Sequence, residues 1–179
     1  HDLATRLSAK SEAITGAGMA GPMRSLLARG KLLKLGAVEV PYPVIAIPRE
    51  TKGAFAQSDV AGNVGFGVLR QFAITYDLPN DALYFERYLN FGTPDITDRG
   101  GIWLERGAGG FAVVDVVAAG PAAQAGLKAG DVIVEINGRA WTEYPLSLFR
   151  DTLRGPPGAR LRIKTAAGTE VTLVSRGLV

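Results

Sequence analysis

The stretch from Gly120 to Gly138, GPAAQAGLKAGDVIVEING, decides the fold of the second half of this chain. Pro121 suits the first turn of a helix, where its missing N–H has no partner to lose. Gly126 can take the left-handed conformation that ends such a helix. A β-branched run over residues 132–136 predicts a buried strand, and the Asn137-Gly138 dipeptide favours a type I′ hairpin turn. The stretch therefore predicts a short helix, a tight loop, a strand and a hairpin in direct succession.

This order, Pro-Ala, Ala-Gly-Leu, Gly-Asp, Ile and Asn-Gly, closely resembles the signature of PDZ domains. The surrounding pattern predicts strands at 102–105 and 111–117, a helix over 144–153, and a final hairpin at 161–163 and 171–173. Within this half, the strand at 102–105 comes first, and the hairpin at 161–163 and 171–173 comes last. This arrangement resembles the permuted, bacterial type of PDZ domain.

The overall composition is that of ordinary folded protein. Of the 179 residues, 47% are hydrophobic and 21% charged, and the formal net charge is +3. This length suits two small domains. No basic stripe is concentrated anywhere, which argues against a nucleic-acid partner, and no apolar run reaches the roughly 20 residues that span a bilayer. The chain has no cysteine, so disulfides and thiolate chemistry are excluded.

The first half predicts short β elements. Residues 1–35 indicate a helical turn followed by a flexible hairpin or loop at the Gly-rich stretch 16–21. Strand formers lie between residues 38 and 47, but three interspersed prolines confine them to short or edge strands. Residues 49–61 are expected to form a loop. The three glycines within 62–69 favour a close backbone crossing.

Two strands are predicted on either side of the turn Asp77–Asp81. Residues 72–76 and 83–85 form them, the first with an alternating apolar pattern. The segment that contains the first of these strands resembles the Leu-x-x-Phe-x-Ile-x-x-Asp ending of a lobe of retropepsin-like or pepsin-like aspartic peptidases. Its sequence is Leu69-Arg-Gln-Phe72-Ala-Ile74-Thr-Tyr-Asp77. This resemblance covers about residues 1–88 and places the loop 16–21 where such a lobe carries a flap. A plain surface hairpin is the alternative for that loop.

Aspartic peptidases of this kind carry a catalytic Asp-Thr-Gly or Asp-Ser-Gly. No aspartate of this chain is followed by Thr or Ser and then Gly. The chain therefore resembles a fragment that begins just after the motif, with His1-Asp2 trailing it; the alternative is a lobe that never had it. We expect no catalytic residue in the chain given, and whether the protein is an enzyme stays open.

The expected fold class is mainly β: a partial acid-protease-like lobe followed by a PDZ domain, a small β barrel or sandwich with two helices. We expect the first domain at residues 1–89, a polar linker marked by Gly and Pro at 90–98, and the PDZ domain at 99–179.

The PDZ resemblance implies a groove that binds an extended polypeptide or a protein C-terminus by strand addition. The loop glycines would let backbone N–H groups hold a carboxylate, although Gly100 stands where the family usually has an apolar residue. The expected peptide-binding residues are Arg99, Gly100, Gly101, Ile102, Trp103 and Leu104 on the loop and strand, and Leu146, Phe149, Arg150 and Leu153 on the helix. The three apolar helix residues also fit a plain core, Arg99 a solvated charge, and Trp103 a cover over the core.

Other chemistry finds little support in the sequence. The single histidine is His1, so no Ser-His-Asp or metal–histidine site is expected, and no cofactor. Asp131 is expected to cap its own turn. Three hypotheses remain: the C-terminal portion of a bacterial aspartic endopeptidase with a PDZ domain, a non-catalytic PDZ adaptor, and a PDZ-like domain whose groove is closed. Resemblance to exported peptidases implies the periplasm or cell envelope, and oligomers are possible.

Overall fold

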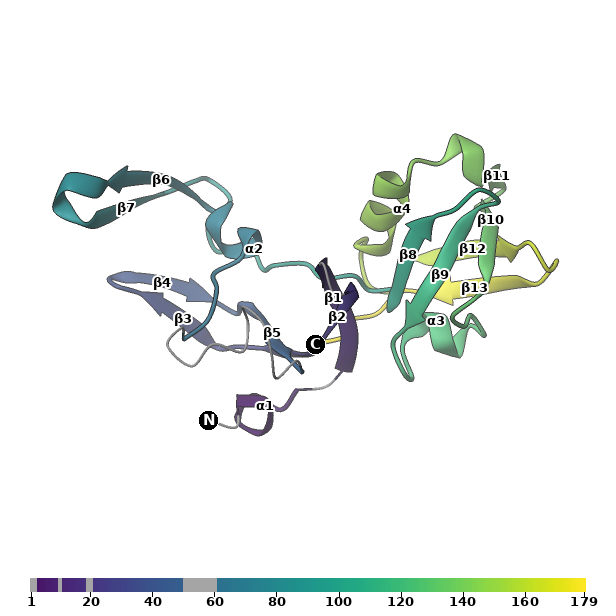
Figure 1. The fold of residues 1–179 in the computed structure, drawn as a ribbon, viewed down its shortest axis with the longest axis horizontal. Coiled ribbons are helices and arrows are strands. Elements are labelled where there is room, and N and C mark those ends of the chain that lie inside the picture. The colour runs from purple at the N-terminus through teal and green to yellow at the C-terminus, as the bar shows by residue number, and fades with distance from the viewer. Residues whose placement is uncertain (1–2, 10, 19–20, 50–60) are drawn as a thin grey trace.

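The structure, a computed structural model, describes residues 3–9, 11–18, 21–49 and 61–179. Figure 1 shows two groups of strands side by side, joined by an extended segment that precedes β8. The described residues contain no helix long and apolar enough to cross a membrane. The predicted loop 49–61 and the tip of the predicted flap fall almost wholly outside the described residues, as do His1 and Asp2.

The first group of elements is built of short strands. In chain order these are α1 (Leu3–Arg6), β1 (Ser11–Gly18), β2 (Gly21–Arg29), β3 (Leu32–Leu35), β4 (Val38–Pro41), β5 (Val44–Pro48), α2 (Phe66–Leu69), β6 (Phe72–Asp77), the 3-10 turn η2 (Leu78–Asn80) and β7 (Ala82–Arg87). The strands form an antiparallel sheet in the order β1-β2-β5 and two hairpins, β3–β4 and β6–β7. The short strands predicted around the prolines are confirmed.

The helical turn and the hairpin predicted for residues 1–35 are confirmed. α1 is followed by β1 and β2, which pair from Ser11 with Leu27 to Gly18 with Gly21. One feature of this half differs from the sequence prediction. The glycine-rich segment 62–69 contains the short helix α2 instead of a simple crossing. A close approach does occur there, because a Cβ on Gly67 would lie within van der Waals overlap of the Asp95 carboxylate.

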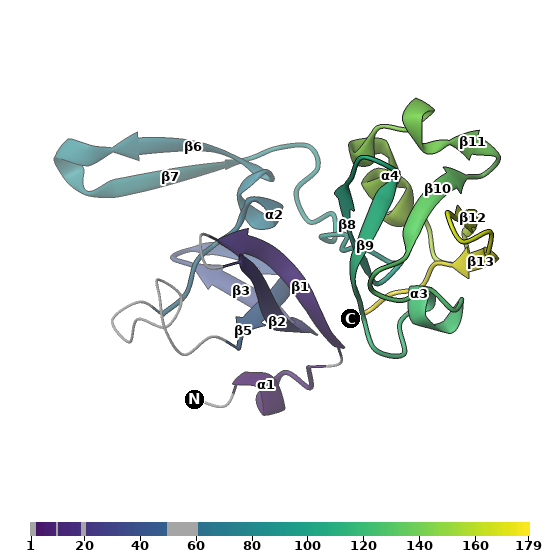
Figure 2. The same cartoon turned by 45° about the vertical axis from the view of Figure 1, so that its right-hand side comes forward.

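The β6–β7 hairpin confirms the two strands predicted around Asp77–Asp81 and extends away from the rest of the molecule in both views (Figures 1 and 2). Its base is packed, with the rings of Phe72 and Phe85 5.5 Å apart. Its outer end is exposed: Tyr76 is 66% and Leu78 is 78% accessible.

The second group of elements is a single sheet with two helices. Its elements are β8 (Ile102–Arg106), β9 (Phe111–Val116), α3 (Pro121–Gln124), β10 (Val132–Ile136), β11 (Arg139–Ala140), the 3-10 turn η3 (Trp141–Glu143), α4 (Leu146–Leu153), β12 (Arg160–Thr165) and β13 (Glu170–Val174). The sheet runs β13-β12-β10-β9-β8, and β11 pairs with β10. The predicted strands are confirmed, whereas the helix predicted to begin at Tyr144 starts two residues later, after η3.

The local turn chemistry follows the sequence closely. Gly126 has φ 94°, and Asn137 and Gly138 have φ 53° and 81°, as a type I′ turn needs. Asp131 accepts a hydrogen bond from the Lys128 amide at 2.9 Å, which confirms its predicted capping role. Behind the sheet, Phe111, Ile133 and Phe149 are fully buried in one hydrophobic cluster. This core fixes α4 beside β8.

Candidate functional site

The loop that precedes β8 is bound to a carboxylate of its own chain. Asp98 accepts hydrogen bonds from the backbone amides of Gly100 at 2.8 Å, Gly101 at 2.7 Å and Ile102 at 3.0 Å. Gly101 has φ 68°, a left-handed conformation that glycine adopts readily and that turns these amides towards one point. The predicted anion-binding loop is therefore formed, and its occupant is Asp98.

The other backbone groups of this loop are also paired within the protein. The Arg99 amide donates to the Leu153 carbonyl oxygen at the end of α4, at 2.9 Å. The carbonyl oxygens of Gly100 and Gly101 accept from the amides of Ala122 and Val117, each at 2.9 Å. Four consecutive amides, from residue 99 to residue 102, thus have partners. The loop is fixed by α4, by α3 and by the end of β9.

The charge state of Asp98 reflects two opposing effects. Burial raises the pKa of the Asp98 carboxyl, and the three backbone donors and the charge of Arg154 partly offset that rise. All three hydrogen-bond partners are donors, and a protonated carboxyl would bring its own O–H against them. The geometry therefore fits the ionised form.

The groove expected for a peptide lies between β8 and α4. β8 is an outermost strand of its sheet, and no other strand of the described residues pairs with its outer side. Along α4, Phe149 and Leu153 are 0% and 1% exposed and belong to the core, while Leu146 is half-buried and packs against it. Of the three apolar helix residues expected to line the groove, only Leu146 retains appreciable accessible surface.

Arg150 spans the groove. Its Nη2 donates to the Leu104 carbonyl oxygen on β8 at 2.9 Å, and its guanidinium lies 5.7 Å from the centre of the Trp103 ring. Trp103 is half-buried, and its indole N–H is buried without an acceptor among the described residues. Arg150 therefore occupies one carbonyl of the strand edge that a guest strand would use.

The remaining two loop residues have defined places. Arg99 is not a solvated charge: its Nη1 donates to the Gly155 carbonyl oxygen at 2.6 Å, just beyond α4. A Cβ on Gly100 would lie 2.6 Å from Cδ2 of Leu153. The helix thus comes too close for an apolar side chain at this position.

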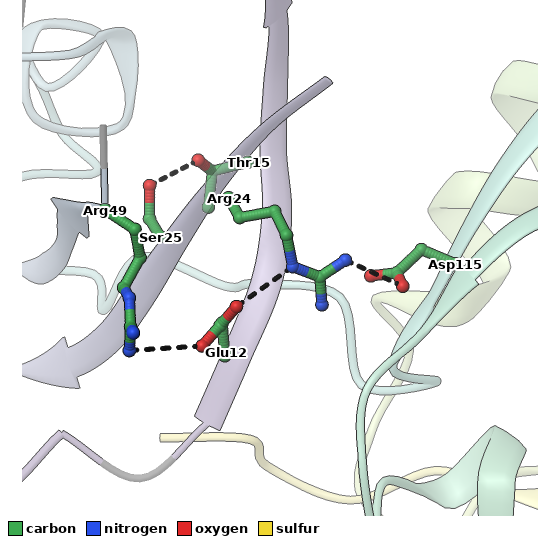
Figure 3. A network of polar contacts seen from close by, with 6 residues as sticks. All are labelled: Glu12, Thr15, Arg24, Ser25, Arg49 and Asp115. Carbon is green, nitrogen blue, oxygen red and sulfur yellow. Dashed lines mark hydrogen bonds and ion pairs between the residues drawn. The ribbon is translucent and has the colours of Figure 1, made fainter. Parts of the chain in front are cut away.

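The two halves of the molecule are in contact beside this site. Figure 3 shows the Arg24 guanidinium between Glu12 and Asp115, with both ion pairs at 2.9 Å, and Glu12 also 3.4 Å from Arg49. These hydrogen bonds raise the pKa of Arg24, the bond to Asp115 first. Ser11 Oγ donates to the Leu178 carbonyl oxygen at 3.0 Å. β1 and β2 of the first half are therefore held against β9 and the C-terminal segment.

A cavity of about 280 Å³ lies at this interface. Apolar side chains of the first half, among them Ile14 and Leu27, line it together with Asp98 and Trp103. Figure 2 shows the strands that contribute to it, β1 and β2, next to β9. Asp98 therefore belongs both to the loop and to the wall between the two halves.

No group of three or more His, Asp or Glu side chains that could hold a metal ion occurs in the ranges the structure covers. The arms of the predicted flap are the paired ends of β1 and β2, and residues 19–20 at its tip lie outside the described residues.

Comparison with known proteins agrees with the second half of the fold. Residues 113–174 match a family model described as a PDZ domain, so a PDZ domain is present there. No curated protein matches the chain. The matched residues begin in β9, after the loop and β8. The predicted boundaries at 89 and 99 stay a prediction, and nothing in the comparisons concerns the peptidase part.

Asp98 is the site residue that the sequence interpretation missed. It was assigned to the linker 90–98, one position before the expected binding residues. The signal was present in the spacing, since an aspartate followed by glycines often accepts bonds from the amides two and three residues on.

Proposed function

We propose that the second domain binds an extended polypeptide by strand addition along the outer edge of β8, between β8 and α4. The single observation that carries this proposal is that β8 ends the sheet of a PDZ domain with no strand of the described residues on its outer side. An outermost strand presents N–H and C=O groups that another chain can pair with. The partner is a polypeptide in extended conformation.

Helix geometry indicates which side chains would meet this guest. Leu146 and Arg150 lie one turn apart on α4, so they share a face, and Arg150 reaches β8. Leu148 lies on the opposite side of the helix and is 45% exposed. Leu146 and Leu148 are thus a matched pair of leucines, one beside the groove and one away from it.

The experiment uses a library of randomised peptides to find binders, followed by mapping of amide chemical shifts in the labelled protein. Peptides should perturb β8 and α4, and N-methylation of their backbone should abolish binding, because strand addition needs their N–H groups. Leu146→Ala should weaken binding and Leu148→Ala should leave it unchanged. Perturbations confined to other elements, or no peptide binder at all, would show that the groove is closed.

A proline substitution at Gly101 would disturb the loop and could not test peptide contacts alone. Gly101 has φ 68°, whereas the proline ring holds φ near −65°. Gly101→Pro would therefore distort the loop and could not report on ligand contacts alone.

The peptidase assignment remains a proposal that rests on the resemblance of residues 1–88. The intact protein would be a bacterial aspartic endopeptidase of the cell envelope whose PDZ domain recruits unstructured substrates. The residues encoded immediately before His1 test this: an Asp-Thr-Gly or Asp-Ser-Gly there would support the peptidase, and its absence would leave the adaptor. Cell fractionation tests the compartment.

A further inference from the structure

Building on the proposed peptide groove, we propose that Asp98 is a built-in substitute for a peptide carboxylate. The groove then accepts extended internal segments of a partner chain and excludes free C-termini. The partner class is thereby narrowed from any extended polypeptide to segments that continue beyond the groove at both ends.

The first step is the geometry of the loop. Within this loop, a terminal carboxylate would be held by the amides that converge on one point, those of Gly100, Gly101 and Ile102. All three already donate to Asp98, at 2.7 to 3.0 Å. The neighbouring Arg99 amide donates to the end of α4. A guest carboxylate would therefore find no free donor in this loop.

The second step is electrostatic. Charge-assisted hydrogen bonds are the strong ones, so three of them make Asp98 difficult to displace. If Asp98 stayed in place, a guest carboxylate would lie close to a charge of the same sign in a partly buried position, where repulsion is poorly screened. Both alternatives oppose a free C-terminus.

The third step concerns the backbone groups of β8 that remain available to a guest strand. The outer edge of β8 beyond Ile102 has no strand partner in the described chain. Its Leu104 carbonyl oxygen is occupied only by Arg150, an exposed side chain that makes one hydrogen bond there. Breaking this one bond costs less than breaking the three that hold Asp98, so a guest strand can displace Arg150 and pair with this edge. It can do so without placing a terminus in the loop.

The test uses one library of randomised peptides in three formats: with a free carboxylate, as the C-terminal amide, and with a Gly-Ser extension after the same sequence. For the wild type we expect the amide and the Gly-Ser-extended formats of each binder to agree within about threefold, and the free carboxylate to bind about threefold or more weaker than both. Asp98→Ala empties the loop, and it should bind the free carboxylates about tenfold or more tighter than the amides.

A second measurement shows whether the loop itself behaves as described. Hydrogen exchange should find the amides of Gly100, Gly101 and Ile102 protected in the wild type and exposed in Asp98→Ala. If that variant does not fold, Asp98→Asn keeps the shape, removes the charge and should show the same preference more weakly.

The outcomes separate this inference from the proposed function. Wild-type protein that binds free carboxylates as tightly as the amides, or more tightly, would overturn the role of Asp98 and leave strand addition standing. The same holds if neither variant at position 98 gains a carboxylate preference. If no format binds to any variant, the groove itself is refuted.

Discussion

Replacing Gly100 by alanine tests how closely α4 packs on the loop. A Cβ at this position would lie 2.6 Å from Cδ2 of Leu153, 3.2 Å from Oδ1 of Asp98 and 3.4 Å from Cγ2 of Ile102. Gly100 is not among the residues with positive φ, so alanine costs nothing in backbone strain there. A loss of stability must therefore come from the clash, and it has to exceed the gain that alanine brings by restricting the unfolded chain.

The expected cost follows from the surroundings of Leu153. That side chain is 1% exposed and lies in the main hydrophobic cluster, so it cannot move without disturbing its neighbours. Overfilling a packed core typically costs about 1–3 kcal/mol. We expect Gly100→Ala to lower the free energy of unfolding of the PDZ domain by about that amount. Urea unfolding followed by tryptophan fluorescence measures it, because both tryptophans, Trp103 and Trp141, lie in this half.

Gly109→Ala is the matched control. A Cβ at Gly109 would meet nothing within 4 Å, and its φ is not positive, so we expect a change within about 0.5 kcal/mol. Leu153→Val shortens the side chain that the new methyl group meets, and it should recover part of the loss when combined with Gly100→Ala. Equal urea midpoints for Gly100→Ala and Gly109→Ala would refute the close packing of loop and helix.

Three further substitutions give sharp outcomes. Because burial raises the pKa of Asp98 above its ordinary value near 3.8, the folded state binds a proton more readily than the unfolded state. The wild type should therefore gain stability relative to Asp98→Asn as the pH falls through the raised pKa. A relative loss of stability in urea titrations over that pH range would contradict this. Asp115→Asn should cost less than about 1 kcal/mol, since the Arg24 side chain is 43% exposed and solvent screens the pair, and high salt should reduce the difference in unfolding midpoint. Asn137→Ala should lower the free energy of unfolding in urea by about 1–2 kcal/mol. Alanine disfavours φ 53°, and the hydrogen bond that the Arg162 amide donates to the Asn137 side chain at 2.9 Å is lost. An unchanged urea midpoint would contradict this.

The fold was predicted most accurately in the second half, where the turn residues and the hydrophobic pattern indicate the same structure. Pro121 fixes its own φ, whereas Gly126 and Asn137-Gly138 permit the left-handed conformations that a helix end and a type I′ turn require, and the structure adopts them. The apolar residues that these turns place on the sheet and on α4 then share one core. Turn residues and strand periodicity therefore gave the PDZ half almost completely.

The first half was less predictable because its strands lack such signals. β1 has the sequence SEAITGAG, whose small and polar residues have little strand preference. Its pairing with β2 is supported by tertiary contacts instead, such as the 2.8 Å hydrogen bond between Thr15 and the buried Ser25, seen in Figure 3. Contacts of that kind leave no periodic pattern in the sequence.

Residue types and spacing indicated the loop, β8 and α4 as the candidate site, and its role in peptide binding stays a prediction. They left open whether Phe149 and Leu153 face the groove or the core, and they could not show that Arg150 bonds to β8. The sequence of the loop likewise cannot show whether its amides are free, since that depends on where Asp98 points.

The linker explains why the state of this loop is not a property of the PDZ domain alone. Two aspartates three positions apart fasten it to opposite halves of the molecule. The Asp95 carboxylate lies 3.6 Å from the Arg70 guanidinium, and its carbonyl oxygen accepts from Arg29 at 3.0 Å, both in the first half. Asp98 binds the loop of the second. The linker therefore contacts both halves and supplies the occupant of the anion-binding loop, and a domain boundary drawn at residue 99 would separate Asp98 from the amides that it binds.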